Sequence, residues 1–329
     1  MNNSQPWQKY PLIRKPLEEV NQLIQATIRT PYSDLQDALL EMASNGGKYL
    51  RPSLLILSAQ IASKKETVSK QIIQLASSIE ILHMASLIHD DIIDDSDERR
   101  GKISIQARFG KDTAVYAGDL LFTHFFDLIL NAISEQDYMI KNAHTMHHLL
   151  AGELGQMAER FNLSQDFNDY LTNVKGKTAA LFRLAAEEGS HFGNGDEQTT
   201  QTLASFGENL GIAFQIVDDI LDYTGGKHLN KPTLEDLTTG VYSLPLLLAL
   251  SKKELREQLV PLLEKKRQMS KNDIEQIQKI LLNSSVIEET HALAEQYTNR
   301  ALANLAQLPQ TNATVLLKKM TRKLVNRTL

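Results

Sequence analysis

Residues 71–92 read QIIQLASSIEILHMASLIHDDI, a run without glycine or proline in which apolar residues recur at helical spacing. Residues 33–47, 171–189 and 203–223 show the same period. No stretch alternates apolar and polar residues convincingly, as a half-buried strand does. The chain has only 16 glycines and 9 prolines among 329 residues, so few positions interrupt a helix. These observations predict an all-α fold.

The chain shows no sign of division into separate domains. It contains no Pro/Gly/Ser-rich linker and no repeat with a period of 20–50 residues. Its length is sufficient for one large core. We therefore expect a single all-α domain over residues 1–329, in which residues 1–30 form an N-terminal arm or first helix.

Composition excludes several classes of function. The net charge is −5 and the basic residues are scattered, which argues against a nucleic-acid partner. The absence of cysteine excludes disulfides and thiolate metal sites. The first residues lack an apolar signal core, and no segment has the ~18 uninterrupted apolar residues of a membrane span. We expect a cytoplasmic protein.

Two acidic clusters share the pattern D-D-x-x-D. The first acidic cluster is Asp90, Asp91 and Asp94, and the second acidic cluster is Asp218, Asp219 and Asp222. Helical spacing places the outer acids of each cluster on one face, where a like-charge pair costs about 0.2–0.5 kcal/mol. Gly101 and Gly225 follow the clusters and are expected to end their helices, whose C-termini disfavour acids. A bound cation would compensate, and oxygen-only donors favour Mg²⁺.

Basic residues occur where helices are expected to begin or end and, in one case, within a helix. They are Lys48 and Arg51 in GGKYLRP (46–52), Arg99 and Arg100, Lys177 beside Thr178 within a helix, and Lys231 before Pro232. Each alone is typical of a solvated surface. Together they indicate two phosphate-bearing ligands, one bridged through metal to the acids and one held directly by cations. The histidine-rich tract 144–148 is expected to be an exposed helix surface, because no H-E-x-x-H pattern accompanies it.

The ordered motifs resemble those of the all-trans polyprenyl (isoprenyl) diphosphate synthase family. They are GGKYLRP (46–52), ILHMASLIHDDIIDDSDERRG (81–101), GKTAALF (176–182), FQIVDDILDY (214–223) and KPTLEDL followed by SLP (231–237 and 243–245). A single DDxxD would be weak, but five motifs in family order cover nearly the whole chain. The resemblance implies a helical bundle around a deep central cavity, with the two acidic clusters facing each other across its mouth.

The resemblance also implies residue roles. The metal ligands would be Asp90, Asp91, Asp94, Asp218, Asp219 and Asp222. The allylic diphosphate would contact Arg99, Lys177, Thr178, Gln215 and Lys231, and isopentenyl diphosphate would contact Lys48, Arg51, His83 and Arg100. The residues that would carry catalysis are Asp90, Asp91, Asp94, Arg99, Lys177, Asp218 and Asp219.

The implied reaction is repeated 1'-4 condensation of isopentenyl diphosphate onto an allylic diphosphate, dependent on two or three Mg²⁺ ions. The chain resembles most the catalytic subunits of bacterial hexaprenyl and heptaprenyl diphosphate synthases. This implies either a homodimer or a heterodimer with a small dissimilar subunit. Membrane contact would be at most peripheral, for product release.

Two positions depart from the family pattern. Val241 stands where many short-chain members have lysine in G-K-x-[TS]-L-P, which removes one expected diphosphate contact. Tyr49 replaces the usual arginine of GGKRLRP, and we expect little effect because Lys48 and Arg51 remain.

Product length should depend on the residues below the first acidic cluster. Ala85 and Ser86 lie about one helical turn, ~5.4 Å, before Asp90. An aromatic residue there ends growth early in the family, whereas small residues also serve simply for close helix packing. We predict a product of about six to eight isoprene units (about C30–C40), counting roughly one helical turn per unit, for a quinone side chain.

Three alternatives compete with this interpretation. His89-Asp90, with His83 nearby, could indicate an HD-type metal phosphohydrolase, but this leaves the second acidic cluster unexplained. A squalene-synthase-like enzyme or terpene cyclase would share the helical fold but not the paired DDxxD with GGKYLRP. A non-catalytic regulatory subunit of the same fold would be expected to have lost acids from one cluster, and this chain keeps both.

Overall fold

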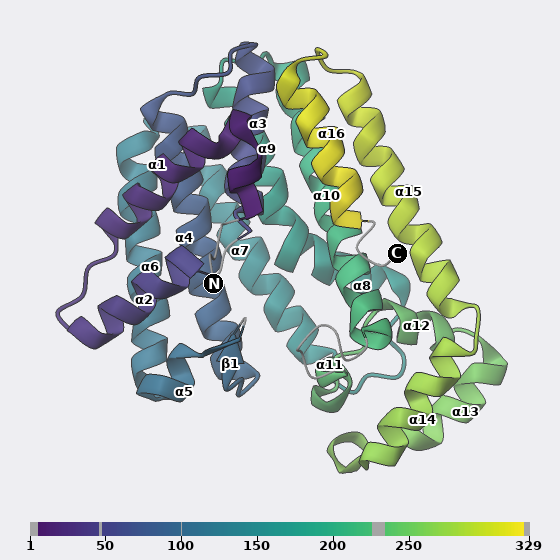
Figure 1. The fold of residues 1–329 in the computed structure, drawn as a ribbon. Coiled ribbons are helices and arrows are strands. Elements are labelled where there is room, and N and C mark those ends of the chain that lie inside the picture. The colour runs from purple at the N-terminus through teal and green to yellow at the C-terminus, as the bar shows by residue number, and fades with distance from the viewer. Residues whose placement is uncertain (1–5, 46–47, 100, 226–233, 326–329) are drawn as a thin grey trace. The chain divides into compact units, whose positions relative to one another are not determined.

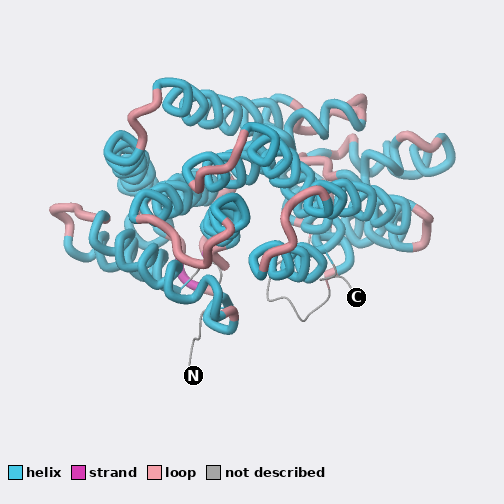
Figure 2. Tube along the Cα trace, turned by 90° about the horizontal axis from the view of Figure 1, so that it is seen from above, coloured by secondary structure: helices cyan, strands magenta, loops and turns pink. Residues whose placement is uncertain are grey.

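The computed structural model describes residues 6–45, 48–99, 101–225 and 234–325, which lie mostly in helices (Figures 1 and 2). In chain order the helices are η1 (Pro6–Lys9), α1 (Pro11–Thr27), α2 (Ser33–Asn45), α3 (Leu50–Ser63), α4 (Lys70–Ile93), α5 (Ile105–Phe109), α6 (Lys111–Ala132), α7 (Gln136–Ala158), α8 (Phe167–Val174), the π-helical turn η2 (Lys175–Ala179), α9 (Ala180–Phe192), α10 (Glu197–Thr224), α11 (Glu235–Thr239), α12 (Leu244–Leu250), α13 (Lys253–Leu263), η3 (Lys266–Gln268), α14 (Lys271–Leu282), α15 (Val286–Ala306) and α16 (Asn312–Val325). The predicted all-α fold is confirmed.

Helix α4 carries the first acidic cluster at its C-terminus. The helix starts where the Ser69 hydroxyl accepts a hydrogen bond from the Ile72 N–H, and apolar residues on all sides make it a core helix. It ends at Ile93, because Asp95 adopts a left-handed conformation with φ of 54°. The prediction that Gly101 ends this helix is therefore wrong. Helix α10 ends at Thr224 directly before Gly225, as predicted.

A short β-hairpin follows α4. Strands β1 (Glu98–Arg99) and β2 (Lys102–Ile103) pair antiparallel, and Gly101 takes φ of 74° in the turn between them. This hairpin was not predicted from the sequence, because strands of two residues are too short to show an alternation of apolar and polar residues. The hairpin places Arg99 close to the end of α4.

The chain forms two compact units. Unit 1 comprises Met1–Ala143, Leu184–Ala204 and Ala306–Leu317, and unit 2 comprises His144–Arg183, Ser205–Leu305 and Lys318–Leu329. In unit 1, α4 packs along α6, and α1 and α3 pack against α4. In unit 2, the C-terminal half of α10 packs in an apolar core with α12, α13 and α14. The first acidic cluster lies in unit 1 and the second in unit 2.

Tyr49 has a larger structural role than the sequence predicted. It precedes α3 with φ of 49°, and its side chain is buried. Its hydroxyl donates to the carbonyl of Ala43 at 3.0 Å and accepts from the side-chain amide of Asn21 at 2.7 Å. Tyr49 thus joins α1, α2 and the start of α3.

Helix α6 is unusually apolar for its exposure. By length and composition, both α4 and α6 are apolar enough to cross a membrane, a test that buried core helices also pass. The most apolar window of α4 is 72% buried, whereas that of α6 is only 39% buried. Large apolar side chains of α6 that reach solvent are Val115, Tyr116, Phe126 and Leu130. Isolated exposed apolar residues are common, but four on one helix form a candidate contact surface.

Candidate active site

The first acidic cluster lies on the last turn of α4, in unit 1. Asp90 is half-buried, Asp91 is buried, and Asp94, the C-terminal cap residue, is exposed. Residues four apart in a helix lie on the same face, so Asp90 and Asp94 are neighbours. The outer carboxylates of the cluster therefore reach solvent, whereas the middle carboxylate is enclosed by protein.

Asp91 is held by the β-hairpin. The Arg99 Nε donates to Oδ1 of Asp91 at 2.7 Å, and a second guanidinium nitrogen bonds the same oxygen. The Asp91 side chain is only 3% exposed, so water screens this ion pair little. Arg99, predicted to bind the allylic diphosphate, here binds the middle acid of the cluster. The two predicted roles, Asp91 with metal and Arg99 with diphosphate, stay predictions.

Five further predicted residues lie in unit 1. His83 is half-buried on α4 and Lys48 is exposed just before α3, while Arg51 is half-buried in the first turn of α3. Ala85 is fully buried, and the Ser86 hydroxyl donates to the His83 carbonyl at 2.9 Å. Arg100 and Lys231 lie outside the described residues.

The second acidic cluster lies near the C-terminus of α10, in unit 2, and its middle acid Asp219 is 5% exposed. Oδ1 of Asp219 accepts from Nε2 of Gln215 at 2.9 Å. Oδ2 accepts from the hydroxyl of Tyr170 at 2.7 Å and from the N–H of Leu244 at 3.2 Å. The Thr178 hydroxyl donates to the Gln215 carbonyl oxygen at 2.8 Å. The predicted residues Thr178, Gln215 and Asp219 therefore form one hydrogen-bonded network.

Burial favours the protonated form of Asp219 in this network. Burial raises the pKa of Asp219 to about 7, and the hydrogen bonds from Gln215, Tyr170 and Leu244 limit the rise. Asp218 is half-buried beside it. The Asp222 Oδ1 accepts from the backbone N–H of Leu234 at 3.0 Å, which anchors the start of α11.

Lys177 and Thr178 lie in the π-helical turn η2, between α8 and α9. The turn packs closely on α7, because a Cβ at Gly152 would lie 2.5 Å from the backbone nitrogen of Lys177. Such π-turns inside helices occur frequently at functional sites. The sequence predicted a regular helix here, not a π-helical turn. The turn carries Lys177 and Thr178, two predicted ligand-binding residues.

Two side chains of α7 hold Lys177, and neither was predicted from the sequence. Nζ of Lys177 lies 2.9 Å from Oε2 of Glu153 and 2.9 Å from Oε1 of Gln156. Tyr170, which supports Asp219, was also missed. The position of Glu153 and Gln156 three residues apart on one helix face was the only sequence signal that could have found them.

A pocket of about 80 Å³ brings these groups together in unit 2. Its lining includes Gln156, Tyr170, Lys177, Thr178, Gln215, Asp219, Val241 and Tyr242. Val241, at the position of the family lysine, contributes an apolar wall. Close by, a Cβ on Gly240 would lie 2.6 Å from the Phe161 ring, so the segment before α12 fits closely against that ring.

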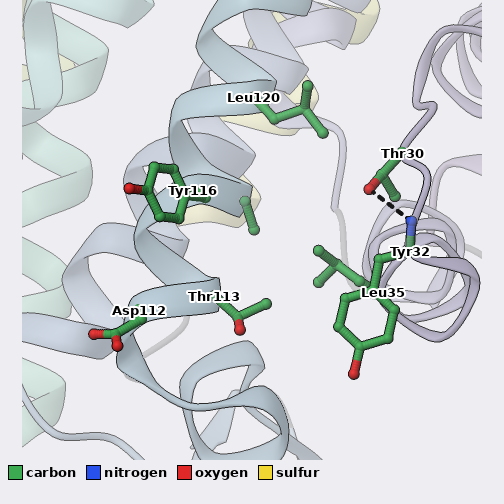
Figure 3. Close-up of a pocket in the computed structure, with 8 residues that line it drawn as sticks. Thr30, Tyr32, Leu35, Asp112, Thr113, Tyr116 and Leu120 are labelled. Carbon is green, nitrogen blue, oxygen red and sulfur yellow. Dashed lines mark hydrogen bonds between the residues drawn. The ribbon is translucent and has the colours of Figure 1, made fainter.

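A second, larger pocket of about 490 Å³ lies in unit 1 between residues 30–35 and α6, and it contains none of the predicted site residues (Figure 3).

Among the described residues, the remaining histidines do not form a metal site with the acids. Nε2 of His89 lies 3.3 Å from Oδ1 of Asp119 and 3.4 Å from the carbonyl oxygen of Val115, both on α6. His144, His147 and His148 are exposed on α7, as predicted. The contacts of His89 do not support the phosphohydrolase interpretation, which needs His89 as a ligand beside Asp90.

The outer acids fit a magnesium ion shared with a phosphate. Within the described ranges, no three acidic or histidine side chains converge to form a complete metal site. Mg²⁺ is usually held by one or two carboxylates together with substrate phosphates and waters. The accessible oxygens of Asp90 and Asp94 match that coordination, with substrate supplying the remaining ligands.

Comparison with known proteins assigns the chain to a family. Residues 33–281 match the family model described as polyprenyl synthetase. The chain belongs to the polyprenyl synthetase family. The chain is 30% identical to heptaprenyl diphosphate synthase component 2 of Bacillus subtilis, over 92% of this chain and 86% of the relative. Its relatives are prenyltransferases, and so is this chain.

Solved structures of this family share the fold of the chain. The geranylgeranyl pyrophosphate synthase of Lactobacillus brevis has a TM-score of 0.91 and 36% identity, over 98% of this chain and 99% of that one. The polyprenyl synthase of Caulobacter crescentus, complexed with calcium and isoprenyl diphosphate, has a TM-score of 0.88 and 30% identity, over 97% of each chain. These similarities cover nearly the whole chain, including both acidic clusters.

Proposed function

We propose that this polyprenyl synthetase adds isopentenyl diphosphate repeatedly to an allylic diphosphate in a Mg²⁺-dependent 1'-4 condensation. The observation that carries the proposal is the network in unit 2, which links the DDxxD acid Asp219 through Gln215 to Thr178, beside Lys177. Lys177 and this network together place a cation, a hydroxyl and an amide around one pocket. Such a set of donors suits a diphosphate.

Magnesium, in two or three ions, would be held chiefly by the outer acids Asp90, Asp94, Asp218 and Asp222. When bound, it would act as a Lewis acid on the diphosphate leaving group. The relative from Caulobacter crescentus, solved with calcium and isoprenyl diphosphate, supports a divalent cation beside a diphosphate. Asp219 would contribute mainly by positioning, because protein donors already occupy both of its oxygens, whereas Arg99 binds Oδ1 of Asp91.

The side chains of unit 2 would orient the allylic substrate. Lys177 would exchange its contacts with Glu153 and Gln156 for the diphosphate, and the Thr178 hydroxyl would donate to a diphosphate oxygen. Positioning of this kind accounts for much of the rate enhancement in two-substrate reactions. The allylic C–O bond breaks with its electron pair on the diphosphate, the new carbon–carbon bond forms, and isopentenyl diphosphate loses a proton to the released diphosphate.

The expected product is long, about six to eight isoprene units. Two small residues, Ala85 and Ser86, stand below the first acidic cluster, and Ala85 is fully buried in α4. The named relatives make products of different lengths, including geranylgeranyl and heptaprenyl diphosphate. Family membership therefore leaves length open, and the two small residues support the longer product, for use as a quinone side chain.

We expect the active form to contain a second subunit, either another copy or a small dissimilar chain. The relative named component 2 in Bacillus subtilis supports the second possibility. The four apolar side chains exposed on α6 support an additional contact in either case. The proposal places the enzyme in the cytoplasm, with at most peripheral membrane contact, and this placement rests on the sequence.

The test is incubation of the purified chain with labelled isopentenyl diphosphate, farnesyl diphosphate and Mg²⁺. Reverse-phase chromatography should separate labelled products of six to eight units, and chelation of the metal should abolish them. Geranyl and geranylgeranyl diphosphate should be tested as starters, with and without a candidate small subunit. Failure to elongate any starter with any partner would contradict the proposal and favour a regulatory subunit.

A further inference from the structure

We propose that His89 is a positioning residue, whose imidazole locks the last turn of α4 onto α6 and thereby sets the direction of Asp90. The proposal rests on the proposed function, in which Asp90 binds metal. His89 belongs to the LIHDD motif, but none of the steps above uses it. Its role would be to act through its neighbour rather than to touch substrate.

The polar and ring contacts that His89 makes with the described residues are all with α6, within unit 1. The Nε2–H group donates toward the Val115 carbonyl at 3.4 Å and toward Oδ1 of Asp119 at 3.3 Å. The imidazole also lies beside the ring of Phe122, with centroids 5.3 Å apart. The His89 side chain is 25% exposed, so most of it is enclosed by protein.

Gly118 forms the seat for the imidazole. A Cβ built on Gly118 would lie 2.3 Å from Nε2 of His89, and its three nearest atoms all belong to the His89 ring. Real Cβ atoms essentially never come this close to another atom. The ring therefore occupies the space where any other residue at position 118 would place its side chain. The imidazole of His89 on α4 thus fills the space that Gly118 leaves open on α6.

Helix geometry explains why this seat matters for Asp90. Successive residues are rotated by about 100°, so His89 and Asp91 lie on either side of Asp90. Asp91 is tied to the β-hairpin through Arg99, and His89 is tied to α6. The two anchors hold the backbone on both sides of Asp90 and leave its carboxylate between them.

The last turn of α4 needs such anchors. Acids at a helix C-terminus face the negative end of the helix dipole, and Asp90 and Asp94 repel each other at their four-residue spacing. Terminal turns also fray readily. Without the His89 contact, the turn would lose a side-chain anchor. Metal binding would then have to restore the order of the turn, which would lower the affinity for metal.

The experiment is a double-mutant cycle with His89→Ala, Gly118→Ala and the double variant. Binding of Mn²⁺ to each protein is measured by electron paramagnetic resonance in the presence of a non-reactive allylic diphosphate analogue. Steady-state kinetics with Mg²⁺ follow on the same proteins. Circular dichroism identifies the folded variants.

We expect each single variant to weaken Mn²⁺ binding by about 10–100-fold, as removal of residues that orient metal ligands does, and to raise the Michaelis constant of the allylic substrate. The Michaelis constant of isopentenyl diphosphate should not change. The double variant should bind no more weakly than His89→Ala alone, because removing the ring removes the clash. His89→Gln, which keeps a donor at similar reach, should restore binding, and the exposed His144→Ala should match the wild type.

Two results would overturn the proposal. One is folded His89→Ala protein with wild-type Mn²⁺ affinity, and the other is full additivity of the two single variants. If His89→Ala does not fold, the Mn²⁺ affinities of His89→Gln and Gly118→Ala are compared instead. Equal wild-type affinity of these two folded variants would overturn the proposal. A wild-type protein that binds Mn²⁺ but never elongates would count against the proposed function, while the binding cycle would still test the role of His89.

Discussion

Replacement of Gly152 by alanine should displace the π-helical turn that carries Lys177 and Thr178. The new Cβ would lie 2.5 Å from the backbone nitrogen of Lys177 and 2.9 Å from the carbonyl oxygen of Asn173, where ordinary contacts are 3.4–4 Å. The turn must therefore withdraw by roughly 1 Å. Misplacement of this size can cost about 100-fold in rate, and overpacking costs about 1–3 kcal/mol of stability.

Gly155→Ala is the matched control, because Gly155 lies one turn further along α7. The three atoms nearest to a Cβ on Gly152 are backbone atoms. Among the described residues, a Cβ on Gly155 would contact only the end of the Asn173 side chain, which can rotate away. Alanine is favoured over glycine within a helix by about 0.8–1 kcal/mol. Gly155→Ala should therefore be neutral or slightly stabilising, and Gly152→Ala should be destabilising despite the same gain.

The assay is urea unfolding of both variants together with steady-state kinetics. For Gly152→Ala we expect a lower unfolding midpoint and a loss of about 10–100-fold in kcat/KM for the allylic diphosphate. Gly155→Ala should stay within about 2-fold of the wild type. Equal behaviour of the two variants would refute the reasoning, because it would show that the close approach of η2 to α7 does not position the turn.

Three further predictions concern burial and product length. Tyr170→Phe leaves Oδ2 of Asp219 with the Leu244 N–H as its one donor among the described residues, and should destabilise the protein by about 1–3 kcal/mol, measured by urea unfolding; an unchanged midpoint would contradict the network. Burial raises the pKa of Glu188 to about 8 from an ordinary 4.5, so the folded chain keeps a proton that the unfolded chain releases. This difference stabilises the folded chain fully below pH of about 4.5, and the stabilisation declines as the pH rises to about 8. Glu188→Gln should therefore reduce the change of the unfolding midpoint with pH, measured at pH 5, 6.5 and 8. An equal change in the variant and the wild type would argue against this role of Glu188. Ala85→Tyr should shorten the product on chromatography and, as overpacking of a buried site, should cost about 1–3 kcal/mol of stability; an unchanged length would refute the role of the small residues.

The sequence predicted the helices well where periodicity extended over several turns. The runs that contain α4 and α10 follow one period without breaking residues, and both helices are present over those runs. The end of α4 was harder to predict. The helix stops at Ile93 because Asp95, not glycine, takes the left-handed conformation, and acids tolerate that conformation without requiring it.

The contacts within the candidate site could not be read from local sequence. Asp219 is held by Tyr170, 49 residues earlier, and by the N–H of Leu244, 25 residues later. A motif gives the spacing of acids along one helix, but the direction of each carboxylate depends on partners supplied by tertiary packing. For the same reason the sequence treated the three acids of each cluster alike, whereas the structure encloses the middle one in both.

The role of Tyr49 was underestimated for a related reason. From the motif alone, Tyr49 was interpreted only as the loss of a positively charged ligand contact. Burial of the side chain and its hydrogen bonds to Ala43 and Asn21 depend on the packing of α1 and α2. A substitution at a motif position can thus be structural rather than functional.

The most direct test of the central claim is elongation by Asp90→Asn and Asp218→Asn, one variant in each acidic cluster. Incorporation of labelled isopentenyl diphosphate is measured with farnesyl diphosphate and saturating Mg²⁺, after the fold of each variant has been verified by circular dichroism. If the two clusters serve one metal-dependent reaction, each variant should lose at least about 100-fold in rate, as loss of an electrostatic stabiliser does. Wild-type incorporation by either folded variant would contradict the account.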